Sequence, residues 1–248
     1  MRNIIKFLPV LATGLGVATS ALAQDDWQIN VTPYIWLALP DGDIAAIVED
    51  SQPEVGAHFD DVRLSGAFTG AVDVRYGRFG ALGDLTYFSI KADKDLTIGP
   101  LPAMSGKVEV AGTKALLVGY YRAYKTEKSS IDVMGGVHYL AADLDVDVIG
   151  ANHHISRSVK DDLWDPVIGV RAKTRLTEHI GLMGLATYGG FGVSSDSLYE
   201  LHGYLTYSFT PKITAELGYR YYSADWSTKR IKYDAALGGP VLGVTFGF

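Results

Sequence analysis

The sequence contains no cysteine, and beyond its N-terminal region it has no long run of apolar residues. Without thiols there can be no disulfide framework, no thiolate metal site and no cysteine nucleophile. The longest uncharged stretch after the N-terminal region covers 180–195. It contains five glycines and is shorter than the roughly 20 residues that a spanning helix needs. A membrane location would therefore require strands instead of helices.

Basic residues are also fewer than acidic ones, 22 against 28. Two of them, Arg2 and Lys6, precede an apolar stretch over 7–19 and the small-residue site Ala21-Leu22-Ala23, which is the order of a secretory signal peptide. We therefore expect residues 1–23 to be a cleaved signal peptide and residues 24–248 to form one barrel domain. That domain carries about eight net negative charges, which argues against a nucleic-acid partner.

The rest of the chain is rich in glycine, in aromatic residues and in alternating apolar and polar positions. Ten segments alternate with the period of two that a strand with one apolar face requires. They are 27–37, 62–76, 79–91, 108–124, 131–147, 166–177, 180–191, 198–209, 213–226 and 235–248. Most exceed the roughly 9 to 11 residues that cross a bilayer at a tilt. The sequence thus predicts an all-β fold, a transmembrane antiparallel up-and-down β-barrel of about ten strands, with eight or twelve as alternatives.

The connections between these segments alternate in length, as in outer-membrane barrels, whose short turns are periplasmic and whose longer loops are external. Tight turns are expected at 77–78, 125–130, 177–179 and 210–212, and long connections after the first segment, over 92–107 and over 148–165. With an even number of strands, both termini lie in the periplasm. Aromatic residues gather near both predicted ends of the strands, which favours membrane girdles, while the core of a soluble β-sandwich is the alternative interpretation.

Charged residues should face the lumen, because a charge on the lipid side costs roughly 2 to 4 kcal/mol near the middle of the bilayer. In 108–124 the more apolar face also contains Lys114 and Arg122, and we expect that face inside. The six charged residues that form the predicted lumen cluster are Arg171, Lys173, Arg175, Glu200, Glu216 and Arg220. Two hypotheses fit them: a charged constriction that sets the selectivity of a narrow pore, or an ion-pair network that closes the barrel.

The final residue, Phe248, follows Leu242, Val244 and Phe246 at alternate positions. This pattern resembles the signal by which the barrel assembly machinery recognises its clients, although a final strand with an apolar face would look the same. Trp27 opens the first predicted strand. We expect the strands marked by Trp27 and by Phe246 and Phe248 to pair and close the barrel.

Candidates for catalysis and metal binding are weak. His138 and His202 face inward, and the pair at 153–154 lies near two serines in an outer loop, yet neither a paired-carboxylate nor a His-Ser arrangement of barrel enzymes can be placed. Acidic outer segments such as 143–147 suit divalent cations held among lipopolysaccharide phosphates, or are simply solvated. The sequence predicts no catalytic residue, no metal site and no cofactor.

Five segments, VTPYIWL at 31–37, WDPVIGVR at 164–171, GGFGVSSD at 189–196, ELGYRYYSADW at 216–226 and GPVLGVTFGF at 239–248, resemble a poorly characterised family of porin-like β-barrel proteins of the Gram-negative outer membrane. The resemblance implies an outer-membrane barrel with no established enzymatic activity or cofactor. Family members commonly carry an acidic residue where this chain has Thr187, just before the GGFG segment.

The sequence therefore predicts an integral barrel of the outer membrane of a Gram-negative bacterium, acting either as a narrow porin-like channel or as a structural and surface-interaction protein. The alternative is a barrel enzyme that acts on lipid A or peptides. The expected partners are outer-membrane lipids and lipopolysaccharide, the barrel assembly machinery and, for a channel, small solutes.

Overall fold

The computed structural model describes the backbone of 27–46, 55–58, 63–96, 104–149, 154–227 and 231–248, and side chains within narrower parts of these ranges. The strands are β1 (Trp27–Trp36), β2 (Leu39–Ala46), β3 (Val55–His58), β4 (Arg63–Tyr76), β5 (Phe79–Leu96), β6 (Met104–Lys125), β7 (Ser129–Ile149), β8 (His154–Arg175), β9 (Ile180–Gly189), β10 (Ser197–Thr210), β11 (Ile213–Ser227) and β12 (Ile231–Gly247). No helix in the described ranges is long and apolar enough to span a membrane. The predicted signal peptide, 1–23, lies outside them and stays a prediction.

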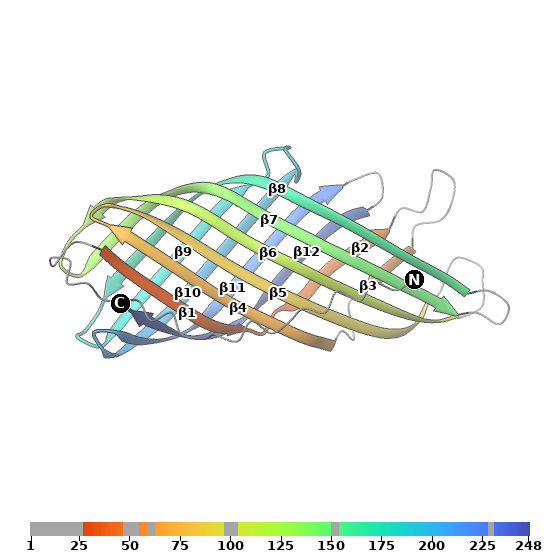
Figure 1. Cartoon of the computed structure of the whole chain (residues 1–248), viewed down its shortest axis with the longest axis horizontal. Helices are drawn as coiled ribbons and strands as arrows, with labels where there is room; N and C mark the ends of the chain where they lie inside the picture. The colour runs from red at the N-terminus through yellow and green to blue at the C-terminus, as the bar shows by residue number, and fades with distance from the viewer. Residues whose placement is uncertain (1–26, 47–54, 59–62, 97–103, 150–153, 228–230) are drawn as a thin grey trace, which may run out of the picture.

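The strands form a closed antiparallel barrel (Figure 1). Strands β4 to β11 each pair with the next strand along the chain, and β1 pairs with both β4 and β12. β2 continues β1 along β12 without a change of register, since Trp36 lies opposite Val241 and Leu39 lies opposite Gly238. β1 and β2 therefore make one barrel strand. β3 pairs with β2 as β4 pairs with β1, so β3 and β4 also make one barrel strand, and the predicted count of ten is confirmed.

The short break between β1 and β2 lies opposite a proline, Pro240, on β12. The N–H of Leu37 donates to the carbonyl oxygen of Pro240 at 3.0 Å, but Pro240 has no N–H with which to return the bond. Beside it, a Cβ on Gly239 would lie only 1.9 Å from the carbonyl oxygen of Leu37. Gly239 thus lets the first barrel strand lie close to β12, and Pro240 removes one hydrogen bond from the ladder between them.

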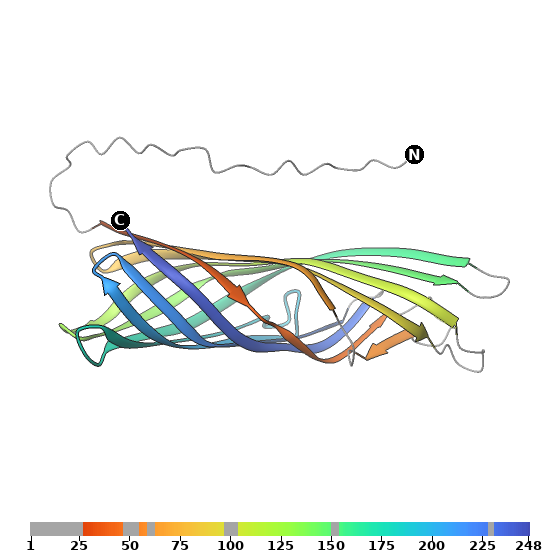
Figure 2. The ribbon, with the colours of Figure 1, turned by 90° about the horizontal axis from the view of Figure 1, so that it is seen from below.

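Both described ends of the chain lie at one end of the barrel, which we call the terminal end (Figures 1 and 2). The N–H of Phe248 donates to the carbonyl oxygen of Ile29 at 2.9 Å, so the last residue is attached to the first strand. The tight connections are at this end too, including the two-residue turn where Gly77 adopts a φ of +56° that glycine tolerates without strain. The described connection between β9 and β10, at 190–196, lies at the opposite end.

Strands β5, β6, β7 and β8 extend far beyond the barrel at the end opposite the termini (Figure 2). They contain 18, 22, 21 and 22 residues, which is more than a bilayer crossing needs. The prediction of long loops over 92–107 and 148–165 was therefore wrong for most of those residues, and the segment after the first strand contains β2 and β3. Paired strands in water need no apolar outer face, so their charged sequences resemble loops.

The faces of the strands follow the predicted alternation. Lys114 and Arg122 are buried inside, whereas Leu117 and Tyr121 of the same strand are exposed on the outer surface. Outward apolar residues recur around the barrel: Phe68, Val72, Ile168, Val170, Leu201, Leu205, Leu217, Tyr219 and Leu242. The outer surface over these strands is thus suited to hydrocarbon, and the charges lie within.

Aromatic side chains form two bands on this outer surface. At the terminal end the rings of Phe79 and Tyr121 lie 5.2 Å apart, and Trp27 pairs in the same way with Tyr76. Further along the barrel the rings of Tyr139 and Trp164 lie 4.6 Å apart. Bands of this kind occur where a barrel wall meets the two membrane interfaces.

We expect Leu117→Arg to lower the free energy of unfolding by about 2 to 4 kcal/mol, because Leu117 is 59% exposed between the two aromatic bands and would place a charge in hydrocarbon. Thr206→Arg is the matched control, since Thr206 lines a cavity on the inner face. Urea unfolding in phosphatidylcholine vesicles measures both variants. Equal destabilisation by the two substitutions would contradict the assignment of faces.

Candidate functional site

Glu200 on β10 is completely buried inside the barrel, where it binds two cations. The Nζ of Lys114, on β6, lies 2.8 Å from its Oε1 and 3.0 Å from its Oε2. Arg220, on the neighbouring β11, donates to the same Oε1 from Nε and contacts it through Nη2. The Nε2 of His202 lies 2.9 Å from that oxygen. One carboxylate therefore connects β6 with β10 and β11 across the lumen.

Arg220 extends these contacts to the opposite wall. Its Nη2 lies 2.8 Å from Oδ1 of Asp84 on β5, and its Nη1 donates to the hydroxyl of Tyr34 on β1. That hydroxyl donates in turn to Oδ2 of Asp84 at 2.7 Å. The guanidinium also lies over the ring of Trp36, 4.8 Å from its centroid. We call Tyr34, Asp84, Lys114, Glu200 and Arg220 the central network.

Packed side chains fill the lumen beside the central network, on the side away from the terminal end. The ring of Tyr222 lies 5.0 Å from the Nζ of Lys114 and stacks on His138 at 5.3 Å. Inward apolar residues are buried around them: Leu140, Leu163, Leu198 and Leu237. Glu200, Arg220 and Tyr222 are 0%, 0% and 1% exposed. These three side chains are therefore shielded from water at this level of the lumen.

A second network lies closer to the terminal end and is centred on Arg171 of β8. Its Nη1 lies 2.5 Å from Oδ2 of Asp73 on β4, and its Nη2 lies 2.8 Å from Oδ2 of Asp132 on β7. Arg122 on β6 donates to both oxygens of Asp132, at 2.7 and 3.1 Å. The hydroxyl of Tyr120 donates to Asp73 at 2.6 Å beneath the guanidinium. These contacts join β4, β6, β7 and β8.

Another buried carboxylate anchors the connection between β9 and β10. Asp165 on β8 accepts the N–H groups of Ser194 and Ser195 at 3.0 and 2.8 Å, and the hydroxyl of Ser195 at 2.6 Å. This connection holds Phe191 at a positive φ of 51°, which a bulky residue rarely adopts. The contacts of Asp165 thus hold a strained loop on the barrel wall, which is a structural role.

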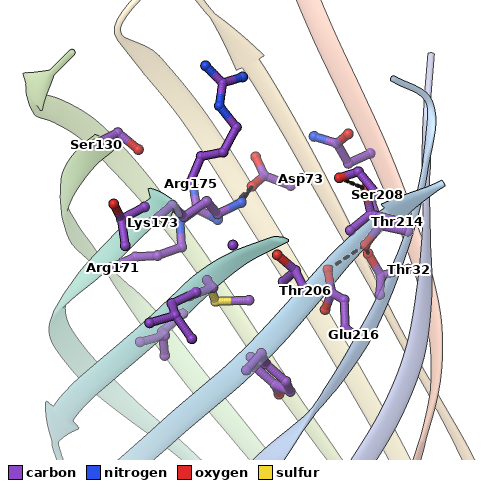
Figure 3. A pocket seen from close by; sticks show the side chains of 18 of the residues that line it. Thr32, Asp73, Ser130, Arg171, Lys173, Arg175, Thr206, Ser208, Thr214 and Glu216 are labelled. Atoms are coloured by element: carbon purple, nitrogen blue, oxygen red, sulfur yellow. Dashed lines mark hydrogen bonds and ion pairs between the residues drawn. The ribbon is translucent and has the colours of Figure 1, made fainter. Parts of the chain in front are cut away.

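Between the two networks and the terminal end lies a cavity of about 430 Å³. Figure 3 shows Arg171, Lys173 and Arg175 of β8 on one wall and Thr206 of β10 and Glu216 of β11 on another. Residues of the tight turns also line the cavity, so it opens at the terminal end. Its inner limit includes Tyr34, Asp84 and His202.

The six residues of the predicted lumen cluster are divided among these environments. Glu200 and Arg220 meet in the central network, and Arg171 belongs to the second network. Lys173 and Glu216 line the cavity, while the Nη2 of Arg175 donates to the carbonyl oxygen of Glu127 in a turn. The structure thus places the six residues at separate levels and does not gather them into one ring.

Sequence reasoning did not single out Asp84, Asp132 or Tyr34, although each lies on the inward face of its strand. Lys114 was expected inside, but its partner Glu200 was unknown, because the two residues are 86 positions apart. The available signal was the alternation itself, which marks inward positions. Which inward charges meet depends on the stagger of the barrel strands, and alternation does not encode that stagger.

The described side chains contain no group of three residues suited to holding a metal ion. The acidic segment 143–147 and the histidines at 153–154 lie outside the described side chains, so the hypotheses about them stay predictions. His202 does contact a carboxylate, but that carboxylate is Glu200, whose oxygens already accept from Lys114 and Arg220. A general base with both oxygens bound to cations is poorly suited to accept a proton.

We expect Glu200→Gln to lower the free energy of unfolding by about 3 to 5 kcal/mol, because Lys114 and Arg220 would stay buried with too few counter-charges. Replacing Lys114 with Met in the same chain should recover part of the loss. A urea unfolding series of the two single variants and the double variant measures the coupling. Additive losses would show that these contacts are not the source of stability.

No protein-family model and no curated protein sequence matches the chain. Among solved structures it is similar to the outer membrane protease OmpT from Escherichia coli, with a TM-score of 0.62 and 10% identity over 93% of this chain and 100% of that chain. The translocator domain of the autotransporter NalP from Neisseria meningitidis gives a TM-score of 0.49 and 11% identity over 92% and 90% of the two chains. The likeness to OmpT establishes the fold, that of outer-membrane β-barrels, which is the fold that the family resemblance implies.

Proposed function

We propose that this protein is a closed structural barrel of the outer membrane of a Gram-negative bacterium, and that its long sheet acts as an interaction surface outside the cell. The central network carries the proposal. It connects five barrel strands, β1, β5, β6, β10 and β11, through side chains that are shielded from water. An arrangement that closes the lumen with ion pairs favours the structural hypothesis over the pore hypothesis.

The outer surface supports insertion in the membrane. Apolar residues such as Leu117 and Leu217 face outward between the aromatic bands, where lipid tails and lipopolysaccharide would contact them. Short turns mark the terminal end as the periplasmic end, so β5 to β8 would extend outside the cell. At the periplasmic end Phe248 is bound to β1 and exposed, a position compatible with its proposed role as an assembly signal.

The contacts of the lumen charges argue against a conducting pore. Arg171, Glu200 and Arg220 are neutralised by partners, and buried ion pairs of this kind do not present a free charge to passing ions. Lys173, Arg175 and Glu216 do face open space, but they lie in a cavity that ends at the central network. A role of the six residues in ion selectivity is therefore not part of the proposal.

The proposal also treats the protein as having no enzymatic activity. The described histidines that face the lumen, His138 and His202, are enclosed with Tyr222 and with Glu200, away from any substrate outside the cell. Incubating the purified barrel with lipopolysaccharide and with peptides should leave both unchanged. Turnover of either substrate would favour the enzyme hypothesis instead.

Planar-bilayer recordings test the closed lumen. We expect the wild-type protein to give no regular conductance steps, because the central network and Tyr222 fill the cross-section. A triple variant, Glu200→Ala with Arg220→Ala and Tyr222→Ala, should give steps, since it removes the side chains that meet across the lumen. Regular steps from the wild type would contradict the proposal, as would a silent triple variant that is correctly folded.

A further inference from the structure

Lys173 has a charge without a close partner. Its side chain is 43% exposed inside the cavity, and its shortest ion pair is with Oδ2 of Asp73 at 3.9 Å. That oxygen already lies 2.5 Å from Arg171, and the other oxygen of Asp73 accepts from Tyr120 at 2.6 Å. Within the described part of the chain Lys173 makes no hydrogen bond. The ammonium of Lys173 is therefore left with unused donors in a confined space.

Glu216, on another wall of the cavity, is in the opposite situation. Its Oε1 accepts the hydroxyl of Thr245 at 2.6 Å, and no described cation forms an ion pair with it. Lys173 and Glu216 are both described residues, and no ion pair joins them. Figure 3 shows the two side chains on different walls, with Thr206 near Glu216. Lys173 and Glu216 thus place opposite charges on different walls of the cavity, and no ion pair joins them.

A hydroxyl accompanies each of these charges. Ser130 on β7 lies directly opposite Lys173 in the strand register, and Thr206 on β10 lies directly opposite Glu216. All four residues line the cavity. A hydroxyl can donate to a carboxylate or accept from an ammonium, so each wall offers a charge together with a neutral hydrogen-bonding group.

We propose that this cavity binds a small zwitterion, an amino acid or a short peptide, whose carboxylate contacts Lys173 and Ser130 and whose ammonium contacts Glu216 and Thr206. The volume of about 430 Å³ falls within the usual range for small-molecule sites. A ligand with both charges satisfies both walls at once, whereas a simple anion would leave Glu216 unpaired. The site opens at the terminal end, so its ligand comes from the periplasmic side.

This site goes beyond the proposed structural function and does not depend on it. The cavity ends at the central network, so the ligand would bind without crossing the membrane. Binding and conductance are consequently separate measurements, and either result stands without the other.

The test is calorimetry of the full barrel in detergent micelles, with alanylalanine as the probe. We expect saturable binding that weakens about tenfold or more in Lys173→Gln and in Glu216→Gln, because each removes one charge-assisted contact. Lys173→Arg should retain binding. Lys212→Gln is the matched control, since Lys212 is an exposed lysine in a turn at the same end and is not part of the cavity lining. A gel-mobility assay of heat-modifiability verifies that every variant is folded.

Capped dipeptides assign each end of the ligand to its wall. N-acetyl-alanylalanine should bind weakly to the wild type and lose little more in Glu216→Gln, whereas alanylalanine amide should bind weakly and be insensitive to Lys173→Gln. Three outcomes would overturn the proposal: no saturable binding of the free dipeptide, equal binding of the free and acetylated dipeptides, or an equal loss in Lys212→Gln.

Discussion

The barrel depends on the need to neutralise charges that its strands bring into a space without water. Glu200 satisfies this need for Lys114 and Arg220, and Asp84 takes the remaining side of Arg220. Because a charge left alone there would be strongly destabilising, the partners hold the strands that carry them in one relative position. Two of these contacts, Glu200 with Lys114 and Asp84 with Arg220, cross the lumen and join strands that do not share a ladder. Closure of the lumen and rigidity of the wall thus have one common cause.

The second network shows the same principle nearer the terminal end, with a different consequence. Arg171 and Arg122 share Asp132, and Arg171 also takes Asp73, so two arginines and two carboxylates balance. Lys173 lies one inward position further along β8 and finds both oxygens of Asp73 already in use. Lys173, which is outside this balanced set of charges, lines the open cavity. A structural network and a candidate binding site are therefore neighbours on one strand.

The two ends of the molecule differ because they meet different surroundings. At the terminal end the strands stop in tight turns just beyond an aromatic band, and the last residue is tied to β1. At the other end β5 to β8 continue as paired strands (Figure 2), where β5 pairs only with β6 and β8 only with β7 in the described register. A strand in lipid needs apolar side chains on its outer face, whereas a strand in water does not. The extension of β5 to β8 therefore differs in composition from the barrel wall.

The sequence by itself determined the class of fold, because a closed barrel in lipid requires strands whose side chains alternate between an apolar outer face and the lumen. This alternation is visible in the sequence, where Leu117 and Leu217 take outward positions and Lys114 and Glu216 take inward ones. It also determined that Arg171, Glu200 and Arg220 face inward. Only the tertiary structure decided which of them meet. Lys114 and Glu200 are far apart in the chain, and their contact depends on the tilt and stagger of ten closed strands. The same geometry decided that the lumen is filled at one level and open at another, a distinction that the spacing of inward charges along single strands does not contain.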